Sequence, residues 1–91
     1  MADRSETIWE FKKGLHFAAE FGEVEVSSGD SFTLDNFEST PTGIIKACLI
    51  VKSTGAEHAA YAVDGTTKNK INITGGSSDC GCVYVAYGVK A

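Results

Sequence analysis

The stretch Val83-Tyr84-Val85-Ala86-Tyr87-Gly88-Val89 decides the fold. Successive side chains of a β-strand point to opposite faces, so Val83, Val85, Tyr87 and Val89 share one face and Tyr84, Ala86 and Gly88 share the other with Cys82. Both sets are mainly apolar. This pattern predicts a strand that is buried on one face and partly covered on the other. Such a strand is central in its sheet or is covered by a partner chain.

Two further stretches alternate in the same way. From Thr66 to Thr74, the side chains on one face are polar and those on the other include two isoleucines, which predicts a half-buried strand: Lys68, Lys70, Asn72 and Thr74 against Asn69, Ile71 and Ile73. From Gly43 to Lys52, one face is apolar and the other mixed: Ile45, Ala47, Leu49 and Val51 against Ile44, Lys46, Cys48, Ile50 and Lys52. Both stretches predict strands whose two faces differ in polarity.

The segment from Glu23 to Leu34 predicts a β-hairpin. Glu23-Val24-Glu25-Val26 alternates cleanly, Ser28-Gly29-Asp30 is a turn sequence, and Ser31-Phe32-Thr33-Leu34 alternates again. Other turn sequences recur between runs of strand-forming residues, and the single proline, Pro41, lies in one of them. A chain of 91 residues with this spacing predicts one all-β domain, a small sandwich or barrel.

The first 21 residues have a different pattern and are expected to form an N-terminal arm (1–21) before the β domain (22–91). Ile8, Phe11 and Leu15 have helical spacing, whereas an extended chain would place Trp9 and Phe11 on one face. Both conformations remain open. The arm is rich in large apolar residues, which this domain or a neighbouring subunit has to cover. We therefore expect an assembly interface formed by Ile8, Trp9, Phe11, Leu15 and Phe17.

The charge distribution argues against a nucleic-acid-binding protein. The net charge is −4, and only 8 lysines and arginines are present, whereas a duplex binder needs a basic surface. Residues 1–45 carry a net charge of −6 and residues 46–91 a net charge of +2. This imbalance is either chance clustering or a pair of complementary faces that meet between copies of the chain. No apolar run approaches the length of a membrane span, and no signal peptide is expected.

Candidate chemistry is sparse. Cys48, Cys80 and Cys82 are expected to be free thiols, with one disulfide as an alternative. A metal site would need these cysteines together with His16 or His58, but the spacing is atypical of zinc sites. The acids Glu20, Glu23 and Glu25 could suggest acid–base catalysis or calcium binding, although a solvated strand face is the simpler interpretation. We predict no catalytic, cofactor-binding or metal-binding residue and no cofactor.

Two segments carry a family resemblance. Thr7-Ile8-Trp9-Glu10-Phe11-Lys12-Lys13 leads into a compact run of strands, and the chain closes with Val83 to Lys90 as an apolar strand. In this the chain resembles the small β-rich virion proteins of tailed bacteriophages, such as capsid decoration (cement) proteins and tail accessory modules. The resemblance implies arm exchange, multimer formation and attachment to a capsid or tail lattice.

The expected function is that of a non-enzymatic structural module of a virion, made in the host cytoplasm, with capsid or tail proteins as partners. We expect a homo-oligomer, with a trimer favoured, because a thin core can hardly cover the apolar arm. The alternative is a small cytoplasmic β-domain that binds a sugar or another small ligand. Its pocket would lie at a sheet edge and would be lined by Trp9, Tyr61, Tyr84 or Tyr87.

Overall fold

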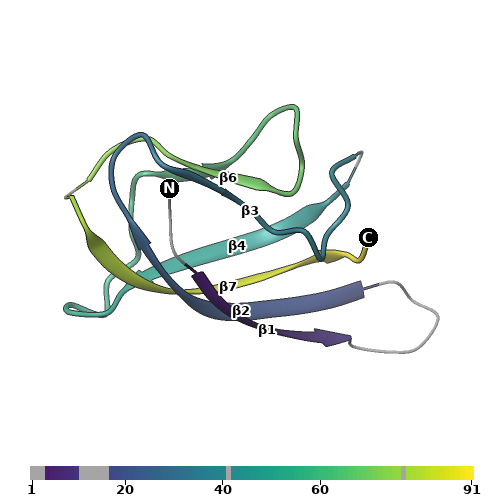
Figure 1. Ribbon diagram of the computed structural model, residues 1–91, viewed down its shortest axis with the longest axis horizontal. Helices are drawn as coiled ribbons and strands as arrows, with labels where there is room; N and C mark the ends of the chain where they lie inside the picture. The colour runs from purple at the N-terminus through teal and green to yellow at the C-terminus, as the bar shows by residue number, and fades with distance from the viewer. Residues whose placement is uncertain (1–3, 11–16, 41, 77) are drawn as a thin grey trace.

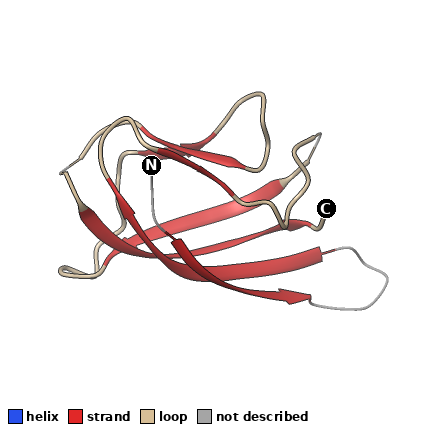
Figure 2. Cartoon of the chain, viewed as in Figure 1, coloured by secondary structure: helices blue, strands red, loops and turns tan. Residues whose placement is uncertain are grey.

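In the computed structural model, the described residues of the chain contain seven strands, which form two antiparallel sheets that pack face to face (Figure 1). The structure describes residues 4–10 by their backbone, and residues 17–40, 42–76 and 78–91 completely. The described part contains strands and loops but no helix, which confirms the all-β prediction (Figure 2). The strands are β1 (Arg4–Glu10), β2 (Phe17–Val26), β3 (Ser31–Thr33), β4 (Ile44–Val51), β5 (Tyr61–Val63), β6 (Lys70–Ile73) and β7 (Cys80–Val89).

Sheet A has the strand order β1-β2-β7-β4, so β7 is flanked on both sides. In the register, Val85 of β7 stands opposite Phe21 of β2 and opposite Cys48 of β4. The central position of the apolar strand is therefore confirmed. The residues of β7 that face inward are Cys82, Tyr84, Ala86 and Gly88, and all four are buried.

Sheet B has the strand order β3-β6-β5, and this arrangement shows that the predicted hairpin is wrong. β2 pairs with β7 and β1, whereas β3 pairs with β6 in the other sheet. The turn sequence does form a turn, in which Ser27 O accepts a hydrogen bond from Asp30 N and Gly29 has a φ of 89°. It leads the chain across to the second sheet, where Gly29 N donates to Ile73 O.

The core lies between the inner faces of the two sheets (Figure 1). Tyr84 of β7 packs against Phe32 of β3 with ring centroids 5.8 Å apart. The strand predicted over Thr66–Thr74 is confirmed for its second half: β6 covers Lys70–Ile73, with Ile71 and Ile73 buried, whereas residues 65–69 form a bend and a turn. The remaining buried apolar residues come from both sheets and their connections: Ala18, Val24, Val26, Leu34, Phe37, Ile44, Ala47, Leu49, Cys82 and Ala86.

A bulge at the start of β4 reverses part of the predicted face. Ile44 stands opposite Gly88 and Lys46 stands opposite Tyr87, so Ile45 is an extra residue in the ladder. Ala47 and Leu49 face the core as predicted, but Ile45 is exposed and Ile44 is buried in its place. A bulge shifts the alternation by one residue, and strict alternation along the sequence cannot show it.

The N-terminal segment is part of sheet A over the residues described. Residues 4–10 are an extended edge strand, with Trp9 opposite Ala19 and Ile8 opposite Glu20 in the ladder. Of the two conformations considered for this segment, residues 4–10 adopt the extended one. The expected boundary between residues 21 and 22 falls inside β2, which runs unbroken from Phe17 to Val26. Gly22 lies within that strand opposite Tyr84.

Candidate interaction surface

The outward side of sheet A is a continuous surface made by three strands, which we call the outer face. Cross-strand neighbours on it follow directly from the register: Phe21, Val85 and Cys48 stand side by side, and Glu23, Val83 and Ile50 stand at the next level. Three strands contribute residues to the outer face. β2 contributes Phe17, Ala19, Phe21, Glu23 and Glu25, and β7 contributes Gly81, Val83, Val85, Tyr87 and Val89. β4 contributes Lys46, Cys48 and Ile50, and Lys52, the residue directly after β4, also belongs to the outer face.

The outer face carries an exposed apolar cluster. Among the described residues, the large apolar side chains that are exposed are Phe17, Phe21, Ile45, Val83, Val85 and Tyr87, and all of them belong to sheet A. Val85, at the centre, is 52% exposed. Single exposed apolar residues are common in monomers, but a contiguous cluster on one face is typical of an interaction site.

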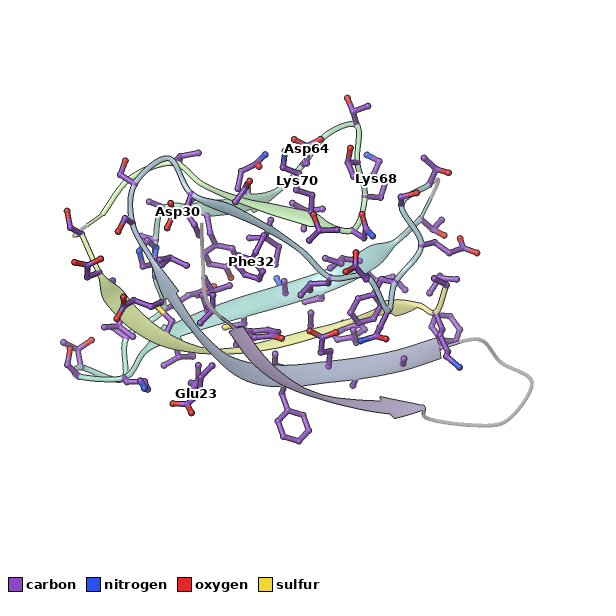
Figure 3. The ribbon with its side chains drawn as sticks, viewed as in Figure 1. Glu23, Asp30, Phe32, Asp64, Lys68 and Lys70 are labelled. Carbon is purple, nitrogen blue, oxygen red and sulfur yellow. The ribbon has the colours of Figure 1, made fainter. Side chains whose placement is uncertain are left out.

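An ion pair borders the apolar cluster at one end. Lys52 Nζ lies 2.7 Å from Glu23 Oε1, although the two residues belong to opposite flanks of β7. The lysine crosses β7 over Gly81, whose missing side chain leaves room: a Cβ there would lie 3.3 Å from Lys52 Cε. The hydrogen bond lowers the pKa of the Glu23 carboxyl and raises the pKa of Lys52. Figure 3 shows Glu23 pointing away from the layer that contains Asp64, Lys68 and Lys70.

The predicted interface residues lie partly on this sheet. Phe17 is the first residue of β2, is exposed, and belongs to the outer face. Ile8 and Trp9 lie in β1, where the structure gives the backbone pairing alone. Phe11 and Leu15 lie outside the described residues. Sequence reasoning missed Val83, Val85 and Tyr87 as surface residues, although it indicated that one side of their strand needed a cover.

The three cysteines are free thiols in the structure. Cys80 and Cys82 both point inward from β7, with their Sγ atoms 3.9 Å apart, whereas Cys48 lies on the outer face. The sheet therefore separates Cys48 from the other two, which rules out both the alternative disulfide and the four-ligand metal site considered above. Burial, and next the hydrogen bond with Cys80, raise the pKa of Cys82 to about 11. A thiol with a raised pKa is a poor nucleophile at neutral pH.

A cleft of about 740 Å³ lies at one end of the sandwich, between the β4–β5 and β6–β7 connections. Its wall includes His58, Asp79 and Cys80. His58 is buried, and its Nδ1 accepts a hydrogen bond from Ala60 N at 3.3 Å, which assigns the ring proton to Nε2 in the neutral form. This ring packs against Gly76, where a Cβ would lie 2.8 Å from Nε2. These contacts indicate that His58 has a structural role in the wall of the cleft.

The three tyrosines proposed for a sugar pocket do not converge. Tyr84 is buried in the core, and Tyr87 lies on the opposite side of the same strand. Tyr61 lies on β5, where its hydroxyl is 2.7 Å from Glu57 Oε1 and 3.0 Å from Ala47 O. Burial, and next this contact with Glu57, raise the pKa of Tyr61. The three tyrosines therefore do not line one pocket.

The acidic cluster suggested by the sequence is split between the two sides of β2. Glu23 and Glu25 are exposed on the outer face as expected, but Glu20 points into the core and is fully buried. Glu20 accepts hydrogen bonds from the Tyr84 hydroxyl and from Asn36 Nδ2, the latter at 3.0 Å. These bonds satisfy a buried carboxylate from within the fold, and the three acids cannot act as one site.

The loop between β5 and β6 depends on another carboxylate. Asp64 Oδ2 accepts hydrogen bonds from the amides of Thr66 and Thr67, at 3.0 and 2.8 Å, and Oδ1 accepts one from Asn72 at 2.8 Å. These bonds, led by the one from Thr67, lower the pKa of Asp64 to about 2. The role of this carboxylate is to hold the loop.

The described residues bring together no group of three or more histidine, cysteine, aspartate or glutamate side chains suited to hold a metal ion. In the same part of the chain, no helix is long and apolar enough to cross a membrane. A scan against models of protein families, a search of curated proteins and a search of solved structures each found no match.

Proposed function

We propose that this chain is a non-enzymatic assembly module that acts by burying the outer face of sheet A against another subunit. The observation that carries this proposal is the location of the exposed apolar residues: Phe17, Phe21, Val83, Val85 and Tyr87 project from one side of one sheet. Sheet B presents no comparable set among its described residues. Burial of apolar surface is the main driving force of stable association.

The area of the outer face is compatible with this role. Strands of 10 residues are about 34 Å long, and three strands spaced about 4.8 Å apart are about 14 Å wide, which gives a flat area of about 480 Å². A standard interface buries about 800 Å² on each partner, measured on a rougher accessible surface. The outer face therefore provides a little over half of such a patch, which corresponds to a contact at the small end of specific interfaces.

The setting we propose is a virion, with the chain as a capsid decoration or tail accessory protein made in the host cytoplasm. This part of the proposal rests on the resemblance of the segments Thr7–Lys13 and Val83–Lys90 to small virion proteins of tailed bacteriophages. The outer face would then contact another copy of the chain or a protein of the capsid or tail.

Particle incorporation tests this function. A tagged chain is produced in cells that assemble virions from the genome that encodes it, and the particles are banded by density. We expect the wild-type chain in the particle band, together with a Thr33→Lys control on the exposed side of sheet B. Val85→Lys, which places a charge at the centre of the outer face, should be lost from the band. A wild-type chain that stays in the soluble fraction, or a Val85→Lys chain that is incorporated normally, would contradict the proposal.

A further inference from the structure

Charges on the outer face are distributed unequally across the strands. The exposed acids Glu23 and Glu25 lie on β2, and the exposed bases Lys46 and Lys52 lie on β4 or directly after it. β7 runs between the two groups with its apolar side chains. By the strand positions of these residues, the outer face has an acidic flank on β2, an apolar middle on β7 and a basic flank on β4, and Lys52 reaches from the basic flank across β7 to Glu23.

Acid and base also share a level along the strands. Glu25 stands opposite Gly81 in the pairing of β2 with β7. On the other side, Lys52 N donates to Gly81 O at 3.0 Å. Glu25, Gly81 and Lys52 therefore form one row across the sheet, two levels from the row of Phe21, Val85 and Cys48.

We propose that the partner of the outer face is a second copy of this chain, related by a two-fold axis parallel to β7. Such an axis places β2 of one copy over β4 of the other and keeps each row at its own level. Glu25 then stands over the strand position of Lys52 of the second copy, so that Lys52 exchanges Glu23 of its own chain for this carboxylate, and the same exchange occurs a second time by symmetry. This inference rests on the proposed function, because it names the partner of the same surface.

The apolar centre fits the same symmetry. An axis parallel to β7 places Val83, Val85 and Tyr87 over the same residues of the second copy. The central strands, which this axis keeps parallel to each other, then form a dry layer between two packed sheets. A surface that is self-complementary in this way suits an isologous contact.

A two-fold axis across the strands is disfavoured by the same register. With its centre at Val85, it reverses the rows and places Glu25 over Phe17 of the second copy. The carboxylate would lose its hydration and gain no opposite charge there. The axis parallel to β7 imposes this cost on Glu23, which it places over Ile50, but it gives Glu25 an opposite charge. Only the axis parallel to β7 brings the acidic flank of each copy over the basic flank of the other.

Charge reversal and mixing test this arrangement. Glu25→Lys and Lys52→Glu are made separately in the full chain, and dissociation constants are measured by sedimentation equilibrium at low salt. Each variant alone should bind its own copy about tenfold more weakly than the wild type, because two like-charge contacts appear at once. An equimolar mixture should form a heterodimer of near wild-type affinity, because both contacts again join opposite charges. Lys68→Glu, on the opposite layer, is the control for net charge and should change nothing (Figure 3).

Circular dichroism and urea unfolding of each variant establish that the fold is intact, and Val85→Lys provides a second variant that weakens the contact without acting through charge pairs. A wild-type monomer at 100 µM or above, a trimer, or a mixture that stays as weak as its components would overturn the arrangement. The two proposals fail separately. A chain that is monomeric but still enters particles, and loses this ability on Val85→Lys, would contradict the dimer and support the assembly function. A chain that dimerises but is absent from particles would support the dimer and contradict the assembly function.

Discussion

Replacing Val85 by alanine tests the outer face at its centre. The substitution removes two methyl groups, worth about 0.8 kcal/mol each when fully buried. Because Val85 is 52% exposed in the single chain, about half of that value, roughly 0.8 kcal/mol, is available to the interface. An isologous dimer contains the residue twice, so the loss is about 1.6 kcal/mol per dimer. We expect the dissociation constant to rise by about 10–20-fold.

Sedimentation equilibrium or light scattering over a dilution series measures this change. Thr33→Ala is the matched control, since it also shortens an exposed β-branched side chain but lies on sheet B. The remaining half of the Val85 burial belongs to the folded chain itself, so the variant's free energy of unfolding should fall by less than about 1 kcal/mol. An unchanged dissociation constant for Val85→Ala, or an equal rise for the control, would refute the reasoning.

Three further predictions concern the fold. Glu20→Ala should lower the free energy of unfolding by about 2–4 kcal/mol in urea titrations, because Tyr84 and Asn36 lose a common acceptor in the core; an effect below about 1 kcal/mol would contradict this role. The pKa of Asp64 is lower in the folded chain (about 2) than its ordinary value of 3.8, so its carboxylate stabilises the fold above about pH 4 and this contribution is lost as the pH falls towards 2. The stability difference between wild type and Asp64→Asn should therefore be largest near neutral pH and vanish near pH 2, and a difference independent of pH would contradict it. Reductant should leave the melting temperature unchanged, because the cysteines are thiols; a fall of more than about 8 °C would imply a structural disulfide.

Strand identity and burial were largely predictable from alternation. The two-sided apolar pattern of Cys82 to Val89 placed β7 in the middle of a sheet, since an edge strand has no need of two apolar faces. The alternation around β6 also gave the correct buried face, because it contains no bulge. Both predictions depend on local sequence alone.

Strand partners were less predictable, because alternation carries no information about which neighbour a strand pairs with. The segment Glu23–Leu34 has the pattern of a hairpin, but Val26 and Phe32 instead face a shared core from different sheets. The reversal of Ile44 and Ile45 depends on how closely β4 approaches Gly88, which is a tertiary contact. The interface prediction included Phe17 but missed Val85 at the centre of the outer face, because the sequence did not show which side of β7 faces the core.

The inward side of β7 is determined by close contacts rather than by hydrophobicity. A Cβ on Gly88 would lie 2.2 Å from Gly43 O, so this position must be glycine and must face the bulge of β4. Tyr84, two levels along, is held by Glu20 and Phe32. A shift of one residue would bring the valines inside but would break both sets of contacts.

The outward positions of β7 have no such constraint from the fold. Threonine would favour a strand there nearly as well as valine and would be compatible with water. The chain nevertheless has Val83, Val85 and Tyr87 on that side, next to Phe21 of β2. Exposed apolar side chains of this kind stabilise little within one copy and promote aggregation unless they are covered. The proposed association accounts for these side chains, and in the proposed dimer the acidic and basic flanks that border them limit the ways in which a second copy can cover them.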